Sequence, residues 1–145
     1  MKNLAFVFLI STISLTCNAE PYLYESGTYK FKAENVTECY NLGTSSPQLH
    51  VCQNHFKDLS KKRLDSSYNN LLSKLTRDKQ KFINAQAKWV EFANLQCQFE
   101  AQASEAYSKP YNAHTEITNI CMDTLRVSRS LYLNKIDTGC AGCVQ

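Results

Sequence analysis

Glycine, proline and long apolar runs are all scarce in this chain of 145 residues, which has four glycines and three prolines. Neither residue occurs between His50 and Lys109, so no glycine or proline breaks helical structure in that stretch. Beyond residue 19, no segment approaches the roughly 20 consecutive apolar residues that a membrane-spanning helix needs. Charged residues make up 20% of the chain and the formal net charge is +3. This balance argues against a dedicated nucleic-acid-binding protein, which typically carries a strong excess of basic residues.

The first 19 residues have the parts of a secretory signal peptide. After a short positive start, the apolar run Leu4–Leu15 is followed by small side chains at Cys17 and Ala19, just before the expected cleavage site. An alternative is a lipid anchor at Cys17, although Ser14 and Thr16 do not match the residues that bacterial lipid attachment favours. The sequence therefore predicts an exported, periplasmic protein without a transmembrane segment.

Three segments of the mature chain show apolar residues at steps of three and four, the spacing of one helix face. We expect helices at 49–75, 78–105 and 113–136. Residues 20–48 are irregular, except that Tyr22–Tyr24 and Tyr29–Phe31 flank a Ser-Gly pair and could form a hairpin. The predicted fold is therefore all-α: a small antiparallel bundle of about three main helices, linked by disulfides, with an irregular N-terminal segment.

This reading divides the chain into four parts. We expect a signal peptide at 1–19, an irregular segment at 20–48, a helical domain at 49–137 and a cysteine-containing tail at 138–145. The core stripe of the second helix is predicted to contain Phe82, Ala85, Gln86, Trp89, Phe92, Ala93 and Cys97. The stripe of the third helix is predicted to contain Ile117, Ile120, Cys121, Thr124, Leu125, Ser128, Leu131 and Tyr132.

Six of the seven cysteines remain once Cys17 is removed or lipidated. They are Cys39, Cys52, Cys97, Cys121, Cys140 and Cys143. An even number in an exported protein indicates up to three disulfides. Cys97 and Cys121 lie near the end of one predicted helix and the start of the next, so we expect these two to be bonded. By proximity we expect Cys39 with Cys52 and the last pair within 140–143, or an exchange of partners between these pairs.

The sequence offers no convincing catalytic or metal-binding constellation. The alternatives are a redox dithiol at Cys140 and Cys143, or a zinc site that adds Cys52 and His55. The dithiol follows a helix, whereas a redox pair sits at a helix N-terminus. The three histidines accompany no hydrolase or phosphate-binding motif. We expect no cofactor, no metal and no enzyme activity.

Charge is unevenly distributed along the chain. Nine basic residues against three acids lie between Lys57 and Lys88, whereas six acids against four basic residues follow from Trp89 onward. The simplest interpretation is a set of solvated helix faces with mixed charges. The alternative is a molecule with one basic end and one acidic end.

Several motifs on the predicted helices resemble one known family. They are Leu64–Tyr68, the run Ala85–Phe92 with Cys97 after it, and Cys121 followed by Arg129 and Leu133. Together they are similar to the LprI-type lysozyme inhibitors, which are small exported helical proteins of bacteria. The resemblance covers roughly Cys39 to Leu133. The residues that match the family pattern are Tyr68, Gln86, Trp89, Phe92 and Arg129. The chain departs from the pattern at Ala93-Asn94, where the family usually has Arg-Asp.

The resemblance implies a non-catalytic binding protein that inhibits a lysozyme or another peptidoglycan hydrolase and so protects the cell wall. Animal lysozymes are cationic, so the acidic residues are the better candidates for a partner surface. They are Glu91, Glu100, Glu105 and Glu116. The alternatives are a structural envelope module without a lysozyme partner, and an immunity protein against a wall-degrading toxin. The sequence does not indicate an oligomeric state.

Overall fold

The computed structural model of the protein describes residues 21–42, 46–105 and 113–138. Its elements are β1 (Tyr22–Ser26), β2 (Tyr29–Ala33), α1 (Val36–Leu42), α2 (Ser46–Lys74), α3 (Lys79–Glu105) and α4 (Ala113–Asn134). The predicted all-α, disulfide-linked fold is confirmed. Each of the three long helices begins and ends within three residues of its predicted position.

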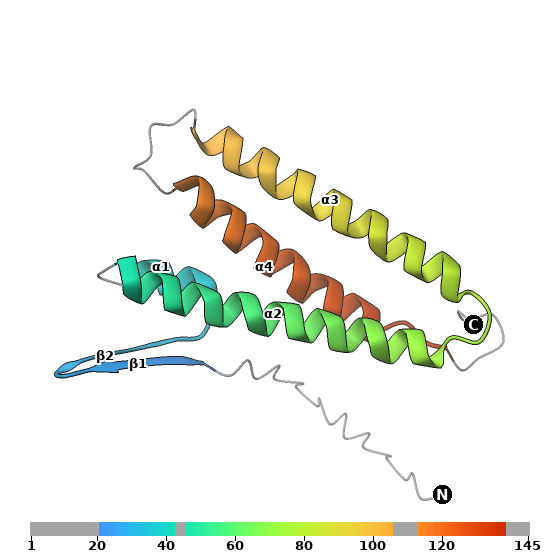
Figure 1. Ribbon diagram of the computed structural model, residues 1–145, viewed down its shortest axis with the longest axis horizontal. Coiled ribbons are helices and arrows are strands. Elements are labelled where there is room, and N and C mark those ends of the chain that lie inside the picture. The colour runs from blue at the N-terminus through green and yellow to red at the C-terminus, as the bar shows by residue number, and fades with distance from the viewer. Residues whose placement is uncertain (1–20, 43–45, 106–112, 139–145) are drawn as a thin grey trace, which may run out of the picture.

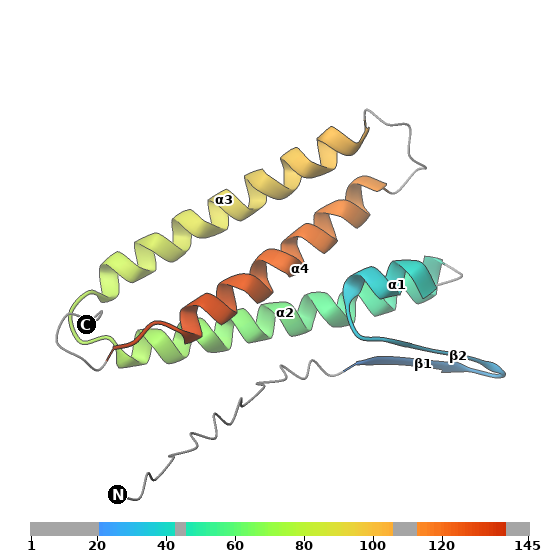
Figure 2. The ribbon, with the colours of Figure 1, turned by 180° about the vertical axis from the view of Figure 1, so that it is seen from behind.

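The three long helices run up, down and up, with α4 between α2 and α3 (Figure 1; Figure 2). Consecutive helices are antiparallel, and α4 packs against both of its neighbours. The hairpin and α1 lie along the N-terminal half of α2, at the end of the molecule where α4 begins (Figure 2). In the described part of the chain, none of the helices combines the length and the hydrophobicity of a membrane span.

The predicted hairpin is present, and its two strands pair antiparallel from Tyr22 opposite Ala33 to Ser26 opposite Tyr29. Its turn needs only two residues because Gly27 adopts a φ of +60°, a backbone conformation that residues with a Cβ rarely adopt.

The N-terminal segment is more regular than the sequence predicted, because it also contains the short helix α1. Asn35 caps this helix: its side-chain oxygen accepts a hydrogen bond from the Glu38 backbone N–H at 3.0 Å. In return, the Glu38 carboxylate accepts one from the Glu34 N–H at 2.7 Å. The two bonds together resemble a capping box, whose usual signature is a polar cap residue followed three positions later by Glu or Gln.

Two clusters of buried residues form the core. The first joins the hairpin, α1 and α2 and contains Phe31, Ala33, Val36, Cys39, Cys52 and Phe56. The second lies near the turn between α2 and α3 and contains Leu64, Leu71, Leu75 and Leu133, with Tyr68, Phe82 and Trp89 packed against it. Leu64 and Leu71 of α2 therefore face the core.

The predicted stripes of the other two long helices are partly wrong. Phe92 and Ala85 of α3 are exposed, as are Thr124, Ser128, Leu131 and Tyr132 of α4. α3 packs mainly on α4, along one side, whereas α4 lies centrally and is covered on two sides. It buries Asp123, Ser130 and Leu133 between its neighbours, and residues between those two sides reach solvent.

Candidate functional site

A groove of about 670 Å³ lies where α1, α2 and α4 meet. It is lined by residues 34–38 at the start of α1, by Phe56, Leu59, Ser60 and Arg63 of α2, and by Asp123, Thr124, Val127 and Ser128 of α4. Most of these side chains come from faces that pack the helices together. The groove is therefore a gap in the packing of α1, α2 and α4.

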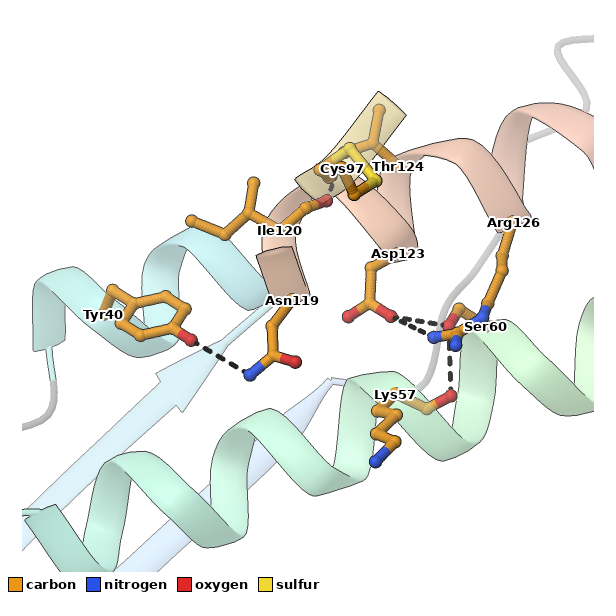
Figure 3. Close-up of polar contacts among 10 residues, drawn as sticks. Tyr40, Lys57, Ser60, Cys97, Asn119, Ile120, Asp123, Thr124 and Arg126 are labelled. Atoms are coloured by element: carbon orange, nitrogen blue, oxygen red, sulfur yellow. Dashed lines mark hydrogen bonds and ion pairs between the residues drawn. A yellow bond between two sulfur atoms is a disulfide. The ribbon is translucent and has the colours of Figure 1, made fainter. Parts of the chain in front are cut away.

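Asp123 is the one buried carboxylate of α4 that lines this groove. Its Oδ1 accepts hydrogen bonds from the Ser60 hydroxyl at 2.7 Å and from the Arg126 guanidinium at 3.2 Å. Figure 3 shows the other oxygen, Oδ2, turned away from these two donors toward the side of Tyr40 and Asn119. Oδ2 has no hydrogen-bond partner among the described residues.

Burial raises the pKa of the Asp123 carboxyl above its ordinary value of 3.8, because the charged form loses solvation. The hydrogen bond from Ser60 and the charges of Arg126 and Lys57 oppose this effect without cancelling it. The Ser60 oxygen also lies 3.0 Å from the Lys57 carbonyl oxygen. Ser60 therefore ties α2 to α4 through a bond whose strength depends on the protonation of Asp123.

A smaller hollow of about 230 Å³ lies between α3 and α4. Glu100 of α3 lines it together with Ile117, Ile120, Cys121, Thr124 and Leu125 of α4. Thr124 also lines the larger groove, so the two hollows are neighbours on α4. We call the two hollows together the α4 groove face.

The charged residues that line the α4 groove face are mostly acidic. Glu34 and Glu38 line the α1 side and Glu100 lines the α3 side, against the single basic lining residue Arg63. Asp123 lies between them, but it is buried and ion-paired with Arg126. Glu34 forms an ion pair with Lys32, which reduces but does not remove its local negative charge. Glu100 accepts a hydrogen bond from the uncharged Gln96 side chain at 2.8 Å. The face therefore suits a cationic partner.

Two disulfides hold the walls of this face. Cys39 and Cys52 join α1 to α2, and Cys97 and Cys121 join α3 to α4. The second is the bond that we expected from the antiparallel order of the helices. Because Cys52 is bonded to Cys39, it is not available for the alternative zinc site. Cys17, Cys140 and Cys143, together with the signal peptide, lie outside the described residues.

The structure separates the acidic candidates for a partner surface. Glu91 is exposed near the middle of α3 and pairs with Lys88 at 2.8 Å. Glu100 belongs to the α4 groove face. Glu116 lies in the first turn of α4. Burial raises the pKa of Tyr40, and the charge of Glu116 adds to this effect. Glu105 ends α3, and its side chain lies outside the described part of the chain.

Comparison with known proteins identifies the family. The family model described as lysozyme inhibitor LprI matches residues 39–133, about two thirds of the chain. The chain belongs to the LprI family. No curated protein and no solved structure matches it significantly. The LprI match begins in α1 and ends in α4, so the hairpin and Glu34–Glu38 on one wall of the groove precede the matched residues.

The residues of the LprI pattern do not all share one place. Arg129 of α4 donates a hydrogen bond from Nε to the Gln86 side-chain oxygen at 3.0 Å, and its guanidinium lies 5.6 Å from the centre of the Trp89 ring. These three side chains form a polar seam between α3 and α4. Tyr68 of α2 stacks on Phe82 near the turn, with ring centres 5.1 Å apart. Phe92 joins neither group, and its predicted place in the core was wrong.

Sequence reasoning missed Ser60, Asp123 and the start of α1. The capping signature Asn35–Glu38 was visible in the sequence and predicts a helix start. No comparable signal marks Asp123, because a single acid on an amphipathic helix normally faces solvent. Its burial follows from the position of α4. Within residues 21–42, 46–105 and 113–138, no group of three or more His, Cys, Asp or Glu side chains is arranged to hold a metal ion.

Proposed function

We propose that this protein is an exported, non-catalytic inhibitor of lysozyme and that it binds the enzyme through the α4 groove face. Membership in the LprI family carries the first part of this proposal. The acidic lining of the face supports the second part, since the carboxylates of Glu34, Glu38 and Glu100 outnumber the basic Arg63 and attract a cationic enzyme. The proposed inhibition protects the peptidoglycan of the producing cell.

The mode of action that fits this fold is that the preformed α4 groove face occupies a surface of the enzyme. Disulfides on both sides of α4 limit the rearrangement of the α4 groove face on binding, so little conformational entropy is lost. Inhibition is then stoichiometric and requires neither free thiols nor metal. Added salt screens the exposed carboxylates and slows association more than it changes the contacts of the bound state.

Lysis protection tests the proposal. Purified mature protein is added to cell-wall suspensions with lysozymes of several types, and turbidity records the rate of lysis. We expect inhibition that reaches completion near one inhibitor per enzyme and weakens as salt is added. Absence of inhibition of every lysozyme would favour a structural envelope module instead. Inactivation by far fewer inhibitor molecules than enzyme molecules would indicate catalysis.

The binding surface is tested by a pair of matched charge reversals on α3. Glu100→Lys places a positive charge on the α4 groove face, and we expect association with a cationic lysozyme to slow by about tenfold at low salt. Glu91→Lys makes the same change nine residues earlier, on the opposite side of the helix. This control should slow association much less. Equal effects of the two variants would show that only overall charge matters and would remove the argument for the groove.

A further inference from the structure

The outer side of α3 carries an exposed stripe with the spacing of a coiled coil. Its seven positions follow one another at alternating steps of four and three residues, and every one of them is exposed. They are Lys81, Ala85, Lys88, Phe92, Leu95, Phe99 and Gln102. We call this set the α3 outer stripe. Where successive positions of such a repeat are apolar, as at Phe92, Leu95 and Phe99, they typically pack against a second helix.

The centre of the α3 outer stripe consists of large apolar side chains in water. Phe92 is 52% exposed, Leu95 is 66% exposed and Phe99 is 65% exposed. With 150–250 Å² for each large side chain, the three expose about 300 Å², within the range of the largest apolar patches on monomers, which are often functional. The opposite side of α3 already packs on α4 through the small residues Ala93, Cys97 and Ala101. Figure 1 and Figure 2 show α3 at the edge of the molecule, with no described element over its outer side.

The arrangement of the stripe suits a second copy of the same helix in antiparallel orientation. Phe92 and Phe99 are equally distant from a point between residues 95 and 96. A two-fold axis through that point sets Phe92 of one copy opposite Phe99 of the other, with the two Leu95 side chains between them. Symmetric self-contacts of this kind are the commonest way in which soluble proteins form dimers.

The charges of α3 favour the same antiparallel orientation. Residues 79–91 contain three lysines and one glutamate, a balance of +2, whereas residues 92–105 contain two glutamates and no basic residue, a balance of −2. Antiparallel pairing sets each basic half beside an acidic half and also opposes the helix dipoles. Parallel pairing would set Lys88 of one copy against Lys88 of the other at the seam, which is unfavourable.

We propose that the α3 outer stripe is a self-association surface through which two copies of this protein form an antiparallel, two-fold symmetric dimer. The dimer does not depend on the proposed inhibition of lysozyme, because the stripe and the α4 groove face are different surfaces. The apolar area is small beside the roughly 800 Å² per partner of a standard stable interface. The association is therefore reversible, with a dissociation constant in the micromolar range.

Sedimentation of the mature, oxidised protein over about 1 to 500 µM tests the proposal, since this range brackets a micromolar dissociation constant. We expect the mean mass to rise from one chain to two. Leu95→Glu should weaken the dimer by at least about tenfold, because it sets two carboxylates against each other at the centre of the seam. The matched control is Leu23→Glu, which places the same charge at an equally exposed leucine of the hairpin and should leave dimerisation unchanged. Circular dichroism and the melting temperature confirm that both variants fold.

The orientation of the helices is tested by a spin label at position 88 of a Lys88→Cys variant, with the parent chain as the control for labelling of its own cysteines. Antiparallel pairing brings residue 88 of one copy level with residue 103 of the other, so the two labels lie about 22 Å apart along the helix axis. Parallel pairing brings them within about 10 Å. A protein that stays monomeric over the whole range, a dimer that Leu95→Glu leaves intact, or the short label distance would each overturn the proposal.

Discussion

α2 and α3 are nearly equal in length, at 29 and 27 residues, and both pack against α4. They differ in what covers their other sides. The hairpin and α1 cover part of α2, and its residues Phe56, Leu64 and Leu71 lie in the core. α3 turns small residues toward α4 and leaves Phe92, Leu95 and Phe99 exposed. The comparison shows that an apolar residue on a helix is buried only where a neighbouring element lies over it.

The small residues of α3 explain how α3 and α4 can approach each other closely. Ala93, Cys97 and Ala101 recur every four residues and form one row along the helix. This row lets α4 come near enough for Cys97 and Cys121 to bond, with their Cα atoms 5.6 Å apart. We therefore expect α3 to depend on its disulfide and on the seam of Gln86, Trp89 and Arg129 more than α2 depends on any single contact.

Removal of the Cys97–Cys121 disulfide should have the largest effect on stability, and it should weaken α3 more than α2. The bond joins residues 24 positions apart, so a Cys97→Ala, Cys121→Ala variant should lose somewhat more than 3 kcal/mol of unfolding free energy. Denaturant unfolding measures the loss, and hydrogen exchange shows where it acts. We expect the amides of α3 to lose protection before those of α2. Equal loss of protection in both helices would show that α3 does not depend on this disulfide more than α2 does.

Truncation of one leucine on α2 and one on α3 should give the next largest difference in stability. Leu71 of α2 is buried in the second core cluster, so Leu71→Ala should cost about 3 kcal/mol through lost burial and a cavity. Leu95→Ala on α3 should change the stability of the monomer by less than about 0.5 kcal/mol, because Leu95 is exposed. Thermal unfolding at low protein concentration separates the two. Similar losses for both variants would mean that Leu95 is covered in solution.

A third pair of variants compares two aromatic residues of α3 itself. Trp89 is partly buried against the leucines of the second cluster and beside Arg129. Trp89→Ala should therefore cost about 2 kcal/mol, less than the 3–5 kcal/mol of a fully buried aromatic side chain. Phe92→Ala, three residues further along, should be nearly neutral in the monomer. If Phe92→Ala is the more destabilising variant, Phe92 rather than Trp89 faces the core in solution.

The smallest expected effect concerns pH and the contact between α2 and α4. Because the pKa of Asp123 is raised by burial, the folded protein keeps this proton at pH values where the unfolded chain has released it. The contribution of Asp123 to stability is thus greatest below pH 3.8 and falls as pH rises through the raised pKa. Asp123→Asn cannot titrate, so its stability relative to the parent should increase from pH 3 to pH 7. Urea unfolding at several pH values measures this difference, and a constant difference would contradict the shift.

Much of the fold could be predicted from the sequence because helices leave a local signal. The absence of Gly and Pro between residues 50 and 109, together with apolar spacing of three and four, located the long helices to within three residues. The pairing of Cys97 with Cys121 followed from antiparallel order alone. The hairpin was also expected, and α1 could have been found from its capping residues.

The candidate site could not be predicted in the same way. The α4 groove face brings together Glu34 of α1, Ser60 of α2, Asp123 of α4 and Glu100 of α3, which are far apart in the sequence. No local pattern relates them, because their proximity depends on how three helices cross. The acidic residues chosen from the sequence included Glu100, but Glu91 of the same helix lies away from the groove.

The sequence by itself determined where the helices lie, which cysteines could pair between consecutive helices, and to which family the chain belongs. Each of these depends on short-range spacing or on a motif. Only the tertiary structure decided which of the predicted stripe residues of α3 and α4 are buried. α4 lies between two neighbours, so it buries Asp123 and Ser130 and leaves Leu131 and Tyr132 exposed. The physical reason is that burial depends on the neighbouring elements around a side chain, whereas the periodicity of a helix reports only its own shape.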